Sequence, residues 1–121
     1  MSGAVGSSPN IALIVKDMIL DANLKTSKEL ACAVQFRGKD LARDRGVHQA
    51  LFYILLGADM PSILIEAGFM SNTKDRKRIL DSKLRHEFAE KLADGIHDFR
   101  LRKKDSKIQK RLSQCQVKEL N

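Results

Sequence analysis

The chain has 121 residues, of which 43% are hydrophobic and 31% are charged, and it contains no tryptophan. This length suits one domain with a modest core, and this composition is typical of a globular protein rather than of a low-complexity, disordered one. Lysine and arginine outnumber acidic residues 22 to 15, so the formal net charge of +7 indicates anionic surroundings without specifying a fold.

Residues 1–10 are predicted to form a loose N-terminal segment, because they are mostly small and polar. They have neither the basic start nor the apolar centre of a secretory signal. No apolar run in the chain is long enough to cross a bilayer. As written, the chain is therefore expected to stay in the cytoplasm.

Two helices are predicted in the first third of the chain. Residues 11–20 are almost wholly apolar with spacings of one, three and four, which favours a mostly buried helix that is broken by residues 21–23. A second helix is expected over residues 26–36, opened by a Thr-x-x-Glu capping box. The charged residues 37–45 indicate a loop.

Two strands are predicted next, over residues 47–56 and 62–69, because β-branched, aromatic and aliphatic residues dominate both. The short connection is too short for the crossover of a parallel pair, so neighbouring strands here would be antiparallel. Apolar residues do not alternate with polar ones, so helices are expected on both faces. The predicted fold class is α/β, with part of a larger mixed sheet flanked by helices.

Two helices and a basic tail are predicted after the strands. Asn72 is a good N-cap for a short helix through Leu80, and apolar residues at every fourth position from residue 84 to residue 96 predict a long amphipathic helix that packs on the sheet. Residues 100–121 are predicted to be a solvated basic tail, either a frayed helical extension or disordered. No aromatic residue lies among its charges, so any nucleic-acid binding would be electrostatic and weakly selective.

The two cysteines, Cys32 and Cys115, lie far apart in the sequence and form no CxxC pattern. Neither a zinc ribbon nor a redox motif is indicated. A disulfide between them stays open, although two isolated cysteines are more often free thiols.

One carboxylate, Glu66, follows three apolar residues, where an unpaired charge is costly to hold away from water. It is either the first solvated residue at a strand end, a buried acid paired with an arginine, or an active-site group that projects into a cleft. A serine nucleophile is not indicated, because Ser71 lies outside any G-x-S-x-G motif and has no histidine near it in the sequence.

Two stretches carry a resemblance to a known family: R-G-V-H-Q-A-L-F-Y-I-L-L at residues 45–56 and P-S-I-L-I-E-A-G-F-M-S-N at residues 61–72. They resemble the C-terminal signature of the zinc-dependent N-acetylmuramoyl-L-alanine amidases of the amidase-3 family, which are peptidoglycan hydrolases. That signature reads roughly R-G-V-K-Q-A, an apolar strand, then P-x-[IVL]-L-[VI]-E-x-[GA]-F-[IM]-S-N. The resemblance covers residues 11–99 and implies the C-terminal portion of an amidase-3 catalytic domain.

The resemblance implies a role for Glu66 as the general base beside a zinc-bound water, in the cleavage of the amide between N-acetylmuramic acid and L-alanine. It implies that Gly68, Ser71 and Asn72 form a turn that leads into a capped helix. It also implies zinc as the cofactor and peptidoglycan as the partner.

The metal ligands of the family are a histidine, a glutamate and a second histidine, and all precede the region that this chain resembles. His48 occupies a position that is commonly lysine in the family. His86 and His97 are separated by roughly 16 Å along a helix, so they cannot share one zinc ion. The chain is therefore predicted to hold no metal ligand and to be inactive alone.

Two other functions stay open, a non-catalytic amidase-like interaction module and a basic protein that binds anions through its tail. A missing N-terminal amidase half is a further expected partner, and no specific nucleic acid is expected. The complete family member is expected in the periplasm or outside the cell.

Overall fold

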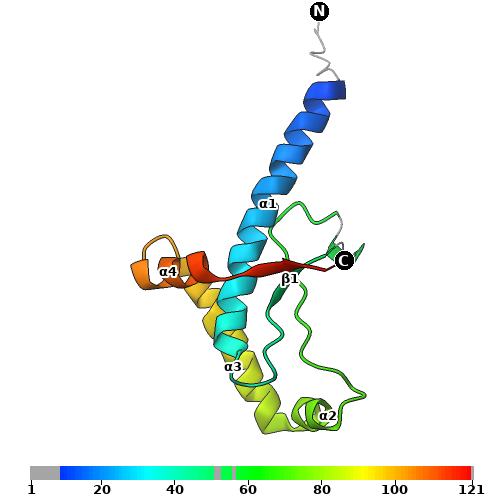
Figure 1. Cartoon of the computed structure of the whole chain (residues 1–121), viewed down its shortest axis with the longest axis vertical. Coiled ribbons are helices and arrows are strands. Elements are labelled where there is room, and N and C mark those ends of the chain that lie inside the picture. The colour runs from blue at the N-terminus through cyan, green and yellow to red at the C-terminus, as the bar shows by residue number, and fades with distance from the viewer. Residues whose placement is uncertain (1–8, 51–52, 56, 121) are drawn as a thin grey trace, which may run out of the picture.

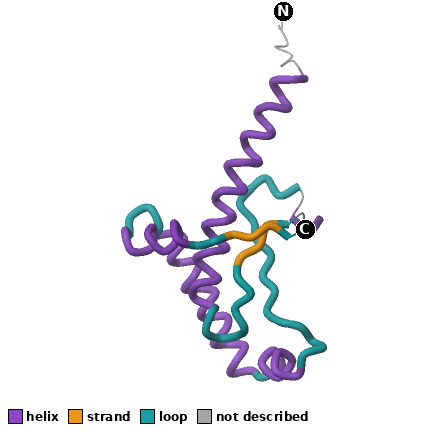
Figure 2. The backbone as a smooth tube through the Cα atoms, in the orientation of Figure 1, coloured by secondary structure: helices purple, strands orange, loops and turns teal. Residues whose placement is uncertain are grey.

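The computed structural model describes residues 9–50, 53–55 and 57–120. Its elements in chain order, shown in Figure 1, are α1 (Pro9–Gly38), β1 (Val47–Gln49), a 3₁₀ helix (Tyr53–Leu55), α2 (Thr73–Leu80), α3 (Ser82–Leu101), α4 (Ser106–Gln114) and β2 (Val117–Glu119). Helices dominate, and the only sheet among these residues is the pair of short strands in Figure 2. The chain is thus α/β in the broad sense.

α1 is one helix of 30 residues, where two were predicted. Residues 21–23, which were expected to break it, are helical. Thr26 opens no capping box, because its hydroxyl donates to the carbonyl of Ala22 one turn back, at 3.1 Å. The predicted break is wrong because aspartate and asparagine each cost a helix interior less than about 1 kcal/mol, which the rest of a long helix easily offsets.

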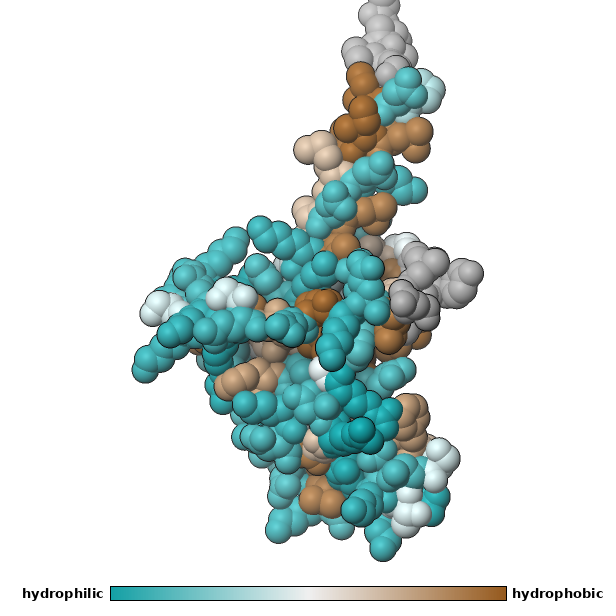
Figure 3. Space-filling model, viewed as in Figure 1, coloured by the Kyte–Doolittle hydropathy of each residue, from teal (hydrophilic) through white to brown (hydrophobic). Residues whose placement is uncertain are grey.

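The first half of α1 is exposed, although it was predicted to be mostly buried. All residues from 9 to 22 are exposed. This half projects away from the rest of the molecule in Figure 1, and its apolar side chains form the brown stretch near the top of Figure 3. No helix in the described part of the chain is long and apolar enough to span a bilayer.

The core lies where the second half of α1 crosses α3. Cys32, Ala33 and Val34 are buried on α1, and Gly95 and Asp98 are buried on α3. A Cβ atom on Gly95 would lie 2.6 Å from the Cα atom of Val34, so glycine allows the two backbones to approach closely. The predicted long helix is confirmed as α3, but it packs on α1 rather than on a sheet.

The two predicted strands do not form an antiparallel pair. Of residues 47–56, only β1 is a strand, and residues 51, 52 and 56 lie outside the described residues. Residues 62–69 form neither helix nor strand, and many of them are exposed. A strand needs a neighbour for its backbone N–H and C=O groups, and an apolar segment alone does not supply one.

β1 instead pairs in parallel with β2, with Val47 opposite Val117. The long connection between them includes α2, α3 and α4, so the crossover that a parallel pair requires is present. The partner strand comes from the segment that was predicted to be a solvated tail.

Residues 102–120, which we call the C-terminal arm, are folded rather than frayed or disordered. α4 begins after Asp105, whose carboxylate accepts hydrogen bonds from the backbone N–H groups of Lys107 at 2.9 Å and Ile108 at 3.2 Å. Ile108 is buried. A disulfide between Cys32 and Cys115 joins the arm to α1, so the expectation of two free thiols is wrong.

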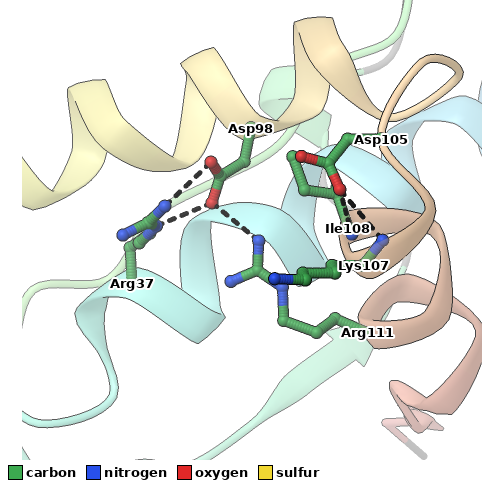
Figure 4. A network of polar contacts seen from close by, with 6 residues as sticks. All are labelled: Arg37, Asp98, Asp105, Lys107, Ile108 and Arg111. Carbon is green, nitrogen blue, oxygen red and sulfur yellow. Dashed lines mark hydrogen bonds and ion pairs between the residues drawn. The ribbon is translucent and has the colours of Figure 1, made fainter.

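Asp98 provides a second attachment of the arm (Figure 4). Its carboxylate accepts hydrogen bonds from Arg37 of α1 at 2.6 and 2.9 Å and from Arg111 of α4 at 3.1 Å. The Arg37 hydrogen bonds, with a smaller contribution from Arg111, hold the pKa of Asp98 below its usual range against the opposing effect of burial. One buried carboxylate thus joins three helices.

Candidate active site at Glu66

Glu66 lies in the irregular segment between the 3₁₀ helix and α2, and its side chain is exposed. Its carboxylate makes no ion pair with any residue that the structure describes. The structure therefore contradicts the interpretation of Glu66 as a buried acid paired with an arginine. Leu64, Ile65 and Phe69 around it are also exposed, so an unpaired carboxylate lies on an apolar, open surface.

The backbone after Glu66 takes a conformation that suits glycine. Gly68 has φ +149°, where residues with side chains are rare. A Cβ atom there would lie only 2.9 Å from the Cγ atom of Asp75. Both facts explain why this position of the motif is a glycine, two residues after the carboxylate.

Asp75 fixes the turn that follows Gly68. Its carboxylate accepts a hydrogen bond from the backbone N–H of Phe69 at 3.0 Å, and the side chain of Asn72 accepts one from the backbone N–H of Asp75 at 3.0 Å. The Phe69 N–H, and to a lesser extent the nearby Arg78, hold the pKa of Asp75 below its usual range. Asn72 is thereby confirmed as the N-cap of α2.

The two halves of the motif meet at Arg45. Its guanidinium lies 4.1 Å from the centre of the Phe69 ring, a cation–π contact between the segment before β1 and the turn after Glu66. Sequence reasoning placed both residues in one motif but did not predict their contact. The one available signal was that an arginine and an aromatic residue occur in the two stretches of that motif.

The three histidines occupy separate places in the structure and make different contacts. His48 of β1 lies with its Nε2 atom 2.7 Å from the carbonyl oxygen of Arg45, and His86 pairs with Glu90 at 3.1 Å on the surface of α3. His97 is exposed farther along α3. None of them approaches the others in a ligand set.

The described residues do not fit a zinc site. They contain no group of three histidine, cysteine, aspartate or glutamate side chains placed to hold a metal ion. Both cysteines are committed to the disulfide, so neither offers a thiolate. The geometry thus presents an exposed carboxylate and a hydrogen-bonded turn. Among the described residues it does not present the three protein ligands that catalytic zinc usually takes.

The family described as N-acetylmuramoyl-L-alanine amidase, amidase-3, matches residues 15–98, which include Glu66 and the turn. The chain belongs to the amidase-3 family. The match ends before the C-terminal arm, so α4 and β2 lie outside it. No solved structure is significantly similar to the chain.

Named relatives support this assignment. The chain is 31% identical over 106 residues to N-acetylmuramoyl-L-alanine amidase AmiC of Neisseria meningitidis, in a match that covers 79% of this chain and 25% of that protein. It is 35% identical over 94 residues to N-acetylmuramoyl-L-alanine amidase LytC of Bacillus subtilis, which covers 76% of this chain and 18% of that protein. The chain thus spans a quarter or less of the length of these two relatives.

Proposed function

We propose that the chain is the C-terminal portion of an N-acetylmuramoyl-L-alanine amidase and that Glu66 is its general base. The reaction would be hydrolysis of the amide between N-acetylmuramic acid and L-alanine in peptidoglycan. The observation that carries the proposal is the exposed, unpaired carboxylate of Glu66 within the family match, beside a turn that Asp75 and Asn72 fix.

In this proposal Glu66 accepts a proton from the water that attacks the amide carbonyl. A general base must reach that proton without losing its lone pairs to another partner, and an exposed carboxylate meets this requirement. Gly68 and Asp75 position the segment, and the exposed apolar side chains beside Glu66 form one wall of the site. The zinc ligands that the family resemblance implies come from outside the described residues.

The remaining portion of the amidase domain is the proposed neighbour of two exposed apolar surfaces. These are the first half of α1 and the segment over residues 62–69. Contiguous exposed apolar surfaces mark places where another protein surface packs. The larger mixed sheet expected from the resemblance would be completed by strands from that portion.

We also propose that the protein works in an oxidising compartment, the periplasm or the cell exterior, rather than in the cytoplasm. The Cys32–Cys115 disulfide supports this, because structural disulfides persist in such compartments and are rare where thiols are kept reduced. An enzyme that acts on peptidoglycan would meet its substrate there.

The role of Glu66 is tested in a full-length amidase that carries this C-terminal portion. We expect Glu66→Gln to lower the rate of hydrolysis by about 10²- to 10⁴-fold, because the amide keeps the shape of the side chain but cannot accept the proton. Bound zinc and the melting temperature should not change. The matched control is Glu90→Gln on the exposed surface of α3, which should keep its activity.

Near-normal turnover of the Glu66→Gln enzyme would contradict the general-base role. Loss of bound zinc together with activity would show instead that Glu66 acts on the metal site.

A second experiment tests the division of the site between two portions of the protein. The isolated chain, incubated with muropeptides and excess zinc, should release no free stem peptide, because its described residues do not fit a zinc site. Product formation should appear only when the remaining amidase portion is present. Release of stem peptide by the chain alone, abolished by a chelator, would refute this division.

A further inference from the structure

The Cys32–Cys115 disulfide lies at an accessible place in the molecule. Cys32 is buried on α1, whereas Cys115, which follows α4, is partly exposed. Both line an open cavity of about 330 Å³. The cations Lys39 and Arg111 line the same cavity and lie against the ring of Phe36, at 4.4 and 4.1 Å from its centre.

This setting suits attack by a thiolate. Thiol–disulfide exchange requires that an anionic sulfur reach one sulfur of the bond, and neighbouring cations favour the thiolate form. Asp98, which also lines the cavity, is already held by two arginines, so its charge is compensated. The cavity is lined by two cations, Lys39 and Arg111, and by two carboxylates, Asp44 and Asp98. A reductant therefore reaches the disulfide because the cavity is open, not because its lining carries a net positive charge.

The position of β2 depends on the disulfide more than the position of α4 does. α4 has its own attachments, namely the buried Ile108 and the hydrogen bond from Arg111 to Asp98. Among the residues that the structure describes, β2 is held by a three-residue ladder with β1 and by one further hydrogen bond from the N–H of Leu120 to the carbonyl of Gln49, at 2.9 Å. An isolated two-stranded ladder is marginal in water, so β2 depends on the covalent link two residues before it.

We propose that this disulfide can be reduced in the folded chain. A dithiol that reduces it releases β2 from β1, while α4 stays in place. The proposal is independent of the catalytic role of Glu66. It assigns a thiol–disulfide exchange site to the cavity and a dithiol, either a small molecule or a protein with a CxxC pair, as its reactant.

One thiolate of the dithiol attacks the sulfur of Cys115, a mixed disulfide forms, and Cys32 leaves as a thiolate. The second thiol of the reductant then attacks its own sulfur in the mixed disulfide and Cys115 leaves. The dithiol becomes a disulfide, the cysteine pair gains two electrons, and the two protons of the dithiol end on Cys32 and Cys115.

Release of β2 exposes the backbone edge of β1, which lies within the family match and next to Arg45. An unpaired edge is open to pairing with another strand. The oxidised and reduced chains thus present different surfaces beside the turn that follows Glu66.

The test uses the full chain, dithiothreitol as the dithiol, and amide hydrogen exchange read by mass spectrometry. In millimolar dithiothreitol without denaturant, alkylation should label both cysteines. Exchange in β1 and β2 should then rise by about 10²-fold, while exchange in α4 changes by less than about threefold. The matched control is the Cys32→Ser/Cys115→Ser double variant, which should exchange like the reduced chain with or without reductant.

Two results would overturn the proposal. Cysteines that stay unlabelled under native conditions would show that the disulfide is closed to dithiols. If the cysteines are labelled while β1 and β2 keep their slow exchange, the pairing of β1 with β2 does not depend on the disulfide.

Discussion

At the scale of single residues, Asp98 shows how the chain holds a charge away from water. Its residue surface is only 5% exposed, and two guanidinium groups offset the cost of desolvating the carboxylate. Arg37 and Arg111 are themselves 37% and 28% exposed, so removing Asp98 would not leave fully buried cations behind. The expected loss of stability is therefore smaller than for a fully buried ion pair.

We expect Asp98→Asn to lower the free energy of unfolding at pH 7 by about 1.5–3 kcal/mol, the range for hydrogen bonds to charged groups. The pKa of Asp98 is lower in the folded state. Its stabilising effect is thus complete above the unfolded pKa near 4 and is lost as the pH falls through the folded pKa.

Urea unfolding of the oxidised chain at pH 7 and in acid should therefore show the gap between native and Asp98→Asn chains closing as the pH drops below about 4. The exposed Asp94→Asn on the same helix is the control and should stay within about 0.5 kcal/mol of the native chain. A gap that is constant with pH would mean that Asp98 acts by packing rather than by its charge.

At the scale of elements, the crossing of α1 and α3 positions the core. The backbones approach so closely at Gly95 that no side chain fits between them. Sequence reasoning predicted the long helix but not this contact, because a glycine in a helix carries no periodic signal.

Gly95→Ala should reduce the free energy of unfolding by about 1–3 kcal/mol, since the added methyl group meets the backbone of Val34 and the helices must move apart. Gly38→Ala at the end of α1 is the matched control, because a Cβ atom there meets nothing within 4 Å. Chemical denaturation of both variants measures the difference. Equal stabilities would mean that the crossing adjusts at little cost.

Features that depend on residues close together in the sequence could be predicted from it, whereas contacts between distant residues could not. Asn72 and α3 were predicted correctly because capping and periodicity depend on residues within one or two turns. The disulfide and the Asp98 contacts were not predicted, because the partners are brought together only by the fold. Of the candidate site, the sequence indicated Glu66 and the glycine turn, and the catalytic role of Glu66 stays a prediction.

At the scale of the whole molecule, the described residues form a small core from which an apolar, exposed half-helix projects. The helical crossing and the arm are held by a disulfide and ion pairs, whereas the first half of α1 lies outside this core. Such a chain is expected to be marginal alone and to bind hydrophobic surfaces.

We expect the isolated chain to bind a hydrophobic dye and to self-associate. Replacing Ile14 and Met18, which are 59% and 66% exposed, with glutamate should reduce dye fluorescence and return the chain to a monomer, because charge makes this apolar surface hydrophilic. Lys16→Glu in the same helix is the control. Fluorescence and sedimentation measure both effects, and a native chain that is monomeric and binds no dye would contradict the proposed packing surface.

The parallel pairing of β1 with β2 also orders events during translation. Val47 leaves the ribosome long before Val117, its opposite residue, is made. At about 5–20 residues per second the delay is on the order of ten seconds, far longer than a helix needs to form. During that interval β1, which lies within the amidase motif, has no partner in the described sheet, although α3 is completed before β2 is made. The nascent strand therefore stays open to mispairing until the C-terminal arm emerges.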